Sequence, residues 1–267
     1  MVPQTPPVMT PETEEPRLTL AEHLEELRRR LGVSLAALVL AIGISASQVE
    51  RILQWLRRPA EDLLPTLAFF SPSEPLIAYV KVATLAGLIL AMPIILAQLW
   101  GFVRAGLTAR ERSSGLAFIG WGSLQFLAGV AFAYYVMLPV SLRVLLGIGR
   151  GVLEPVISVD RYLSFVTAVI VWCGVVFELP VVLFALAKVG IVTPEWLRQQ
   201  RPYAILVLVI LSAIVTPTTD PVTLLLMAAP LWLLYELSIL VVRWPARAST
   251  RTPPRRTTPS RPARGRA

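Results

Sequence analysis

The sequence predicts an all-α membrane protein with six transmembrane helices and both termini in the cytoplasm. Long apolar runs recur between about residues 31 and 242, the mean hydropathy is +0.66, and only 16% of the residues are charged. A composition of 55% apolar residues with runs of this length is typical of a polytopic membrane protein. The first run resembles a signal peptide, but no soluble domain follows it, so we interpret it as a retained span.

The two ends of the chain differ from its middle. Residues 1–16 are rich in proline, threonine and glutamate, and we expect a disordered leader there. Residues 17–243 should form the six-span membrane domain. Residues 244–267, rich in arginine, proline, threonine and serine, should be a disordered basic tail that either contacts anionic lipid or has no role.

The first element should be a short surface helix that begins near Thr19 and leads into a span over residues 31–47. Thr19 and Glu22 fit a capping box, in which each side chain satisfies a free backbone N–H group. Glu26 precedes Arg30 by four residues, a spacing that supports a helix. One apolar stripe runs along it, formed by Leu20, Leu24, Leu27 and Leu31.

The other spans are predicted from apolar runs bounded by charged loops. They lie at about 75–102, 114–139, 162–187, 203–215 and 222–242. Residues 48–72 mix polar and apolar positions, which predicts short amphipathic helices on the outer interface, interrupted by Pro59 and Pro65. Of the 25 lysines and arginines, 18 fall on the side of the termini, and this bias places the termini in the cytoplasm.

Two connections and one packing feature are also predicted. Residues 141–161 should be an outer loop, and Thr193 should cap a short helix in the second inner loop. Small residues in the third span should let it approach neighbouring helices closely. These residues are Gly115, Gly120, Gly122 and Gly129.

The fifth span is unusually short. Its apolar core, residues 204–215, rises only ~18 Å, whereas a typical hydrocarbon core is ~30 Å thick. It could be one arm of a re-entrant hairpin. We favour a full but short crossing that thins the bilayer, because only a turn of four residues, 217–220, separates it from the sixth span.

Composition argues against an enzyme and against a cofactor or metal site. The chain has one cysteine, Cys173, and one histidine, His23, so a disulfide framework and a cysteine-based metal site are excluded. It has no HExxH motif and no histidine to pair with a membrane serine. The net charge of +8 is interpreted as orientation and contact with lipid headgroups, so nucleic acid is not an expected partner.

Three carboxylates in or near the spans are candidates for special roles. Glu178 lies within the fourth span, where a charge costs about 2.5–3.5 kcal/mol, so it should face the bundle interior, a wet cavity or a partner. The alternative is a hydrogen bond between helices with no further role. Glu236, nearer the inner end, should extend to the interface or pair with an arginine, and Asp220 should cap the last helix.

Glu26 and Glu111 lie on the predicted inner face, one before the first span and the other in the loop after the second. If the first three spans pack together, the two carboxylates can converge on one basic ligand. Paired hydrogen bonds from guanidinium groups would then favour arginine over lysine. The alternative is that these acids form ordinary solvated ion pairs.

The order of several motifs from about residue 18 to 243 resembles the TatC family, the multi-span subunit of the twin-arginine protein translocase. These motifs are His23-Leu24-x-Glu26-Leu27-Arg28-x-Arg30, Ser71-Pro72-x-Glu74, Gln98-x-Trp100-x-Phe102, Glu111-Arg112, Tyr162-Leu163-Ser164-Phe165-Val166, Phe177-Glu178-x-Pro180, Gly190-Ile191-x-x-Pro194-Glu195-x-Leu197-Arg198, Arg201-Pro202-Tyr203, and Thr216-Pro217 with Asp220. The chain departs from the family pattern after Phe102, where an expected proline is missing. The loop that carries Glu111 should therefore be less rigid.

The resemblance implies a curved, glove-like bundle with a concave groove, in which the fifth and sixth spans are short. It also implies a non-enzymatic role in the bacterial cytoplasmic membrane. The protein would bind twin-arginine signal peptides at the cytoplasmic face and nucleate an assembly that transports folded proteins, driven by the proton-motive force. Its partners would be TatA/TatB-type single-span subunits and, within a larger complex, further copies of itself.

The resemblance also assigns roles to particular residues. Glu26 and Glu111 would meet the arginine pair of the signal peptide, and Glu178 would lie in the groove. Thr216 and Asp220 would mark a partner-binding edge beside the short fifth span. The residues surrounding the two acids would be Arg28, Phe102, Leu107 and Arg112.

The alternative function is a small-solute secondary transporter. Such proteins are built from repeats with broken helices and several polar residues near the bilayer midplane. This sequence has no clear internal repeat and one deep carboxylate, Glu178. Solute flux in proteoliposomes that hold only this chain would distinguish the two functions, because a lone translocase subunit should show none.

Overall fold

The computed structural model describes residues 20–64, 66–104, 115–148, 155–216 and 220–249, and its regular structure is helical. In chain order the elements are α1 (Leu20–Ala46), α2 (Val49–Arg57), the 3₁₀ turn η1 (Arg58–Ala60), α3 (Glu74–Arg104), α4 (Gly115–Phe132), the π-helix η3 (Ala133–Met137), α5 (Leu138–Gly147), α6 (Val159–Phe177), α7 (Leu179–Lys188), α8 (Pro194–Gln199), α9 (Arg201–Val215) and α10 (Pro221–Ser249). The predicted leader, residues 1–16, lies outside the described residues.

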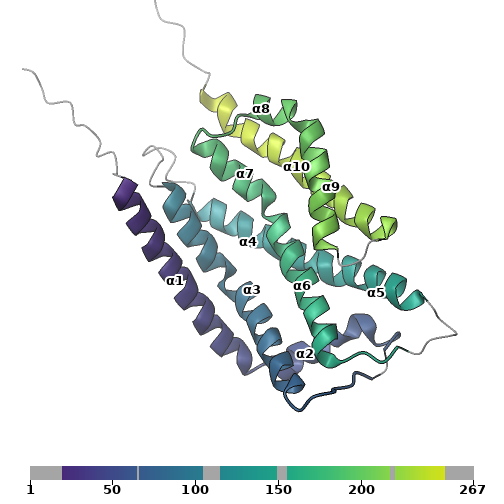
Figure 1. Ribbon diagram of the computed structural model, residues 1–267. Helices are drawn as coiled ribbons and strands as arrows, with labels where there is room; N and C mark the ends of the chain where they lie inside the picture. Colours follow the sequence, from purple (N-terminus) through teal and green to yellow (C-terminus); the bar gives the residue numbers. More distant parts are fainter. Residues whose placement is uncertain (1–19, 65, 105–114, 149–154, 217–219, 250–267) are drawn as a thin grey trace, which may run out of the picture.

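The helices are arranged with α1 at one edge of the molecule and α9 and α10 at the other (Figure 1). Helix α3 packs against α1 on one side and against α4 and α6 on the other, while α10 packs against α7 and α9. Both α1 and α3 extend to the end of the bundle at which α1 begins and α10 finishes. We name this end the terminal face and the opposite end, where α2 lies, the α2 face.

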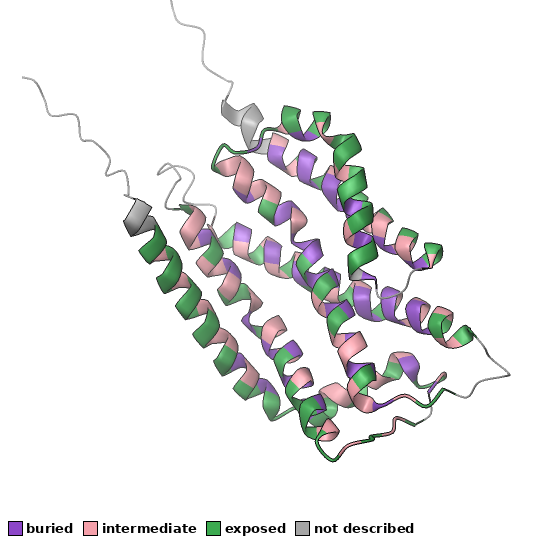
Figure 2. Cartoon of the chain, viewed as in Figure 1, coloured by how far each residue is buried: buried purple, intermediate pink, exposed green. Residues whose placement is uncertain are grey.

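Helix α1 is one continuous helix, so the predicted surface helix and the first span are two parts of the same element. The leucine stripe continues into the apolar run, and no proline interrupts the helix between Leu20 and Ala46. Most of its surface is exposed, as the green ribbon in Figure 2 shows. Its contact with α3 is close, because Gly87 leaves no space for a β-carbon beside Ile42.

Close packing of α4 on α6 forms the centre of the bundle. A β-carbon at Gly129 would lie 2.7 Å from the backbone oxygen of Cys173 and 2.8 Å from Cβ of Phe177. Gly174 on α6 similarly accommodates the ring of Phe126. The prediction of close packing is confirmed for Gly129, but it was wrong for Gly120, which has no atom within 4 Å of where its β-carbon would lie.

The third span is longer than predicted, and the start of the outer loop at residue 141 was wrong. Helical structure continues through η3 and α5 to Gly147. Pro139 was expected to end the span, but it occupies the first turn of α5, where its missing N–H group costs little. The preceding N–H, of Leu138, donates to the carbonyl of Ala133, and this π-type bond keeps the helix continuous.

The α2 face is closed by an amphipathic helix, as predicted for residues 48–72. The last carbonyl groups of a helix lack partners within that helix. In α2, the carbonyls of Trp55 and Leu56 accept hydrogen bonds of 2.7 Å from the hydroxyls of Tyr134 and Tyr162. The rings of Trp55 and Tyr134 also stack at 4.1 Å, so α2 is held to η3 and α6.

Five helical segments within the described residues are long and apolar enough to cross a membrane, and α9 is the shorter sixth. The 15 residues of α9 rise about 22 Å, which confirms that it is short. The sixth span was expected to be short as well, but residues Pro221–Arg243 of α10 are long enough to cross. Helix α10 continues to Ser249, so the first six residues of the predicted disordered tail are helical.

Candidate functional site

The candidate site starts from Glu26, near the beginning of α1 on the terminal face. The Nε and Nη2 atoms of Arg30 donate to Oε1 of Glu26 at 2.9 and 2.6 Å. The predicted pairing of these two residues at a spacing of four is therefore confirmed. Both side chains are about one-quarter exposed, so the ion pair is partly shielded from solvent.

The guanidinium of Arg30 lies against the backbone of α3 at Gly101. A β-carbon at Gly101 would overlap Nη1 of Arg30, so only glycine leaves room for the side chain in this position. The next residue, Phe102, is half-buried, whereas Arg28 is exposed on α1. The structure thus brings Glu26 and Arg30 of α1 to the end of α3 that holds Phe102.

Three predicted site residues, Leu107, Glu111 and Arg112, lie outside the described residues. The chain on either side of them is placed: α3 ends at Arg104, and α4 begins at Gly115. A β-carbon at Gly115 would lie 2.5 Å from Nε1 of Trp100, so the start of α4 is close to the last turns of α3. The convergence of Glu26 and Glu111 remains a prediction.

Glu178 occupies the break between α6 and α7 and is buried, with 6% of its surface exposed. Pro180 follows in the first turn of α7, where it is tolerated at a helix start. Oε2 of Glu178 lies 3.4 Å from where a β-carbon would stand on Gly122 of α4. Neither carboxylate oxygen of Glu178 has a hydrogen-bond partner among the described residues. The alternative of a hydrogen bond from Glu178 to another helix is therefore not found among these residues.

An apolar space of about 600 Å³ lies beneath α2, apart from Glu178, which does not line it. Helices α1, α2, α3, α4 and α6 and the π-helix η3 all contribute to its walls. Its lining includes Ile44, Trp55, Leu85, Leu127, Tyr134 and Ile170.

Polar contacts lie at and near the ends of α9 and α10. Oδ2 of Asp220 accepts hydrogen bonds of 2.7 Å from the backbone N–H and the hydroxyl of Thr223, which confirms that Asp220 caps α10. Thr216 is buried, and its hydroxyl donates to the carbonyl of Ser212. At the terminal face, Glu236 pairs with Arg201 at 2.6 Å. This confirms the predicted alternative in which Glu236 pairs with an arginine.

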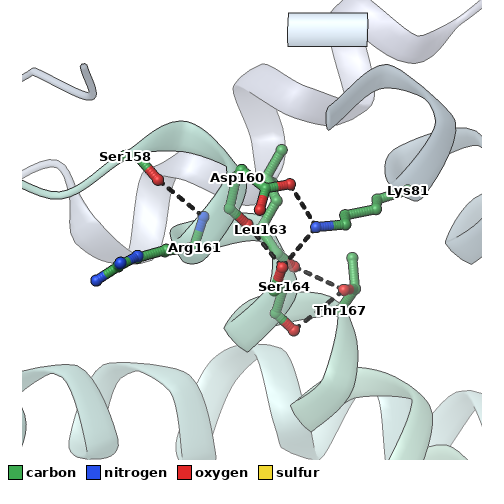
Figure 3. A network of polar contacts seen from close by, with 7 residues as sticks. All are labelled: Lys81, Ser158, Asp160, Arg161, Leu163, Ser164 and Thr167. Carbon is green, nitrogen blue, oxygen red and sulfur yellow. Dashed lines mark hydrogen bonds and ion pairs between the residues drawn. The ribbon is translucent and has the colours of Figure 1, made fainter. Parts of the chain in front are cut away.

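A polar network at the α2 face was missed by sequence reasoning (Figure 3). Nζ of Lys81 on α3 donates to Oδ1 of Asp160 at 2.5 Å and to Oγ of Ser164 at 2.6 Å. The hydroxyl of Ser164 in turn donates to the carbonyl of Asp160. Lys81 and Asp160 carry opposite charges at the same end of two different spans, and this was the signal that could have revealed the pair.

Within the described residues, no three histidine, cysteine, aspartate or glutamate side chains are grouped so as to hold a metal ion.

The predicted short helix after the fourth span is confirmed, because the hydroxyl of Thr193 accepts a hydrogen bond from the backbone N–H of Trp196 at the start of α8.

Comparison with known proteins gives a consistent assignment. Residues 22–230 match the family model of the Sec-independent protein translocase protein (TatC). A TatC of Carboxydothermus hydrogenoformans is 40% identical over 86% of this chain and 95% of its own length, and one of Aquifex aeolicus is 39% identical over 84% and 94%. A crystal structure of the twin-arginine translocase receptor TatC superposes with a TM-score of 0.72 at 38% identity, covering 85% of this chain and all of that one. The chain therefore belongs to the TatC family of Sec-independent protein translocase proteins.

Proposed function

We propose that this protein is the receptor subunit of a twin-arginine translocase in a bacterial cytoplasmic membrane. It binds twin-arginine signal peptides on the terminal face, which is cytoplasmic, and nucleates an assembly that moves folded proteins with the proton-motive force. One observation carries the proposed site: the carboxylate of Glu26 already accepts two hydrogen bonds from a guanidinium, that of Arg30. The position therefore has the chemistry and the access that a peptide arginine requires.

Two carboxylates suit an arginine pair better than a lysine pair. A guanidinium presents N–H groups in a rigid planar fork that matches a carboxylate, whereas an ammonium is a point charge without that geometry. Glu26 takes one arginine and Glu111 the other. Arg28, Phe102, Leu107 and Arg112 complete the surroundings. The apolar segment of the peptide then follows the bundle interior toward the apolar space beneath α2 and past Glu178.

The partner-binding edge is the outer face of α9. Because α9 rises only about 22 Å, the bilayer beside it is thinned. Most of its exposed side chains are apolar and suit the transmembrane helix of a TatA/TatB-type subunit. They include Leu206, Val207, Ile210 and Ile214. Thr216 and Asp220 fix the end of this edge through their hydrogen bonds. Several copies of this protein, each with its partner subunits, assemble in the active complex.

The test is binding of a labelled signal peptide to the detergent-solubilised full chain, comparing an Arg-Arg peptide with its Lys-Lys version. We expect wild type to prefer Arg-Arg, and Glu26→Gln and Glu111→Gln each to weaken that binding about tenfold or more. Glu25→Gln is the matched control, because Glu25 is the exposed neighbour of Glu26 on the same helix. Equal binding of both peptides, unchanged by either substitution, would contradict the assignment.

A further inference from the structure

We propose that Arg30 is an internal competitor that occupies Glu26 until a signal peptide arrives. The inference rests on the proposed function, in which Glu26 receives a peptide arginine. Arg30 carries the same chemical group as the incoming side chain and makes the kind of contact that the peptide would make. A peptide arginine must therefore displace Arg30 before it can pair fully with Glu26.

The hydrogen bonds show how the exchange can begin. The Nε and Nη2 atoms of Arg30 both donate to Oε1 of Glu26, and no described residue donates a hydrogen bond to Oε2. A fork-to-fork pair uses both oxygens of a carboxylate. An arriving guanidinium can first contact Oε2 while Arg30 still holds Oε1, and it gains its second hydrogen bond only when Arg30 leaves.

The position of Arg30 against α3 distinguishes it from an ordinary surface side chain. The three atoms nearest to a β-carbon built on Gly101 all belong to the Arg30 guanidinium. The side chain is therefore packed between Glu26 and the backbone of α3, and it is 27% exposed. An ion pair of this strength is weak enough for an incoming arginine to replace it. Breaking the pair should lower the affinity of the peptide about two- to fivefold.

The alternative is that Glu26 and Arg30 merely stabilise α1, as pairs at this spacing commonly do. The two explanations differ in what removing Arg30 does to binding. A helix-stabilising pair predicts unchanged or weaker binding of the peptide. An internal competitor predicts tighter binding, by the same factor for Arg-Arg and Lys-Lys peptides, because both must displace the same group.

The experiment measures the affinities of both peptides for the full chain carrying Arg30→Gln, with Arg29→Gln as the control. Arg29 is the adjacent exposed arginine, so its replacement removes the same charge from the same helix without vacating Glu26. We expect Arg30→Gln to tighten binding about two- to fivefold, and Arg29→Gln to change it by much less. Equal effects of the two substitutions, or no tightening with Arg30→Gln, would overturn the proposal.

Gly101→Ala is a second, charge-neutral variant that changes the space available to the guanidinium. The new methyl group meets Arg30 before any other described side chain, so the guanidinium must move and binding should tighten. Unchanged affinity would show that packing against α3 does not hold Arg30 on Glu26. Failure of the proposed function looks different, because Glu26→Gln would then leave Arg-Arg binding intact whatever happens with Arg30→Gln.

Discussion

Two ion pairs at opposite ends of the bundle, Glu26–Arg30 and Lys81–Asp160, differ in what they connect. On the terminal face, Glu26 and Arg30 are four residues apart on one helix, so the pair can open without separating any two helices. On the α2 face, Lys81 and Asp160 are 79 residues apart and join α3 to α6. The first arrangement suits a site that exchanges one guanidinium for another, and the second suits a support that holds the helices around it in place.

The hydrogen bonds around each pair extend this difference. Lys81 also donates to Ser164, and two tyrosine hydroxyls hold the end of α2 nearby. Such connections between distant segments are lost only when the helices move apart. We therefore expect substitutions in the centre and at the α2 face to reduce stability, and substitutions at Glu26 to reduce binding with little effect on stability.

The largest loss of stability is expected from Gly129→Ala, where α4 contacts α6. The added methyl group would lie 2.7 Å from a backbone oxygen that cannot move independently of its helix. We expect the free energy of unfolding to fall by about 1–3 kcal/mol, measured by denaturant titration in mixed micelles. Gly120→Ala on the same helix is the matched control. It should be neutral or stabilise by up to about 1 kcal/mol, because the site is open and alanine favours a helix.

A somewhat smaller loss is expected from Lys81→Met, which leaves Asp160 without its ionic partner. Both side chains are about 30% exposed, so solvent screens the pair and limits the cost to roughly 1–2 kcal/mol of unfolding free energy. Arg143→Met, at an exposed position of α5, should have almost no effect.

The Lys81 pair can be isolated by a double-mutant cycle. The Lys81→Met/Asp160→Asn protein should be more stable than the sum of the two single substitutions predicts. Strict additivity would mean that the Lys81–Asp160 pair does not connect α3 to α6 energetically, and the contrast between the two ends would fail.

The smallest effect on stability is expected from Glu26→Gln. Exposed or partly exposed ion pairs contribute about 0.2–1 kcal/mol, so the unfolding titration should shift only slightly. The same protein should nevertheless lose most of its binding to an Arg-Arg peptide. A stability loss as large as that of Lys81→Met would show that the Glu26–Arg30 pair is a structural support like the Lys81–Asp160 pair.

Features encoded within a few neighbouring residues could be predicted from the sequence. The pairing of Glu26 with Arg30, the Asp220 cap and the Thr193 cap each depend on groups within four positions of each other. The end of the third span could not, because the π-helix η3 continues the helix past Pro139 to Gly147. Tyr134, within η3, contacts Trp55 of α2, which lies 79 residues away in the chain.

By itself, the sequence determined that this is a helical membrane protein with a short fifth span, because apolar runs of a given length leave few other ways to satisfy the backbone in a bilayer. Its ordered motifs also identified the family. Only the tertiary structure decided that Arg30 packs on Gly101, that Lys81 pairs with Asp160, and that Glu178 is buried beside Gly122. The reason is physical: these contacts join helices far apart in the chain, and their geometry depends on how the helices pack.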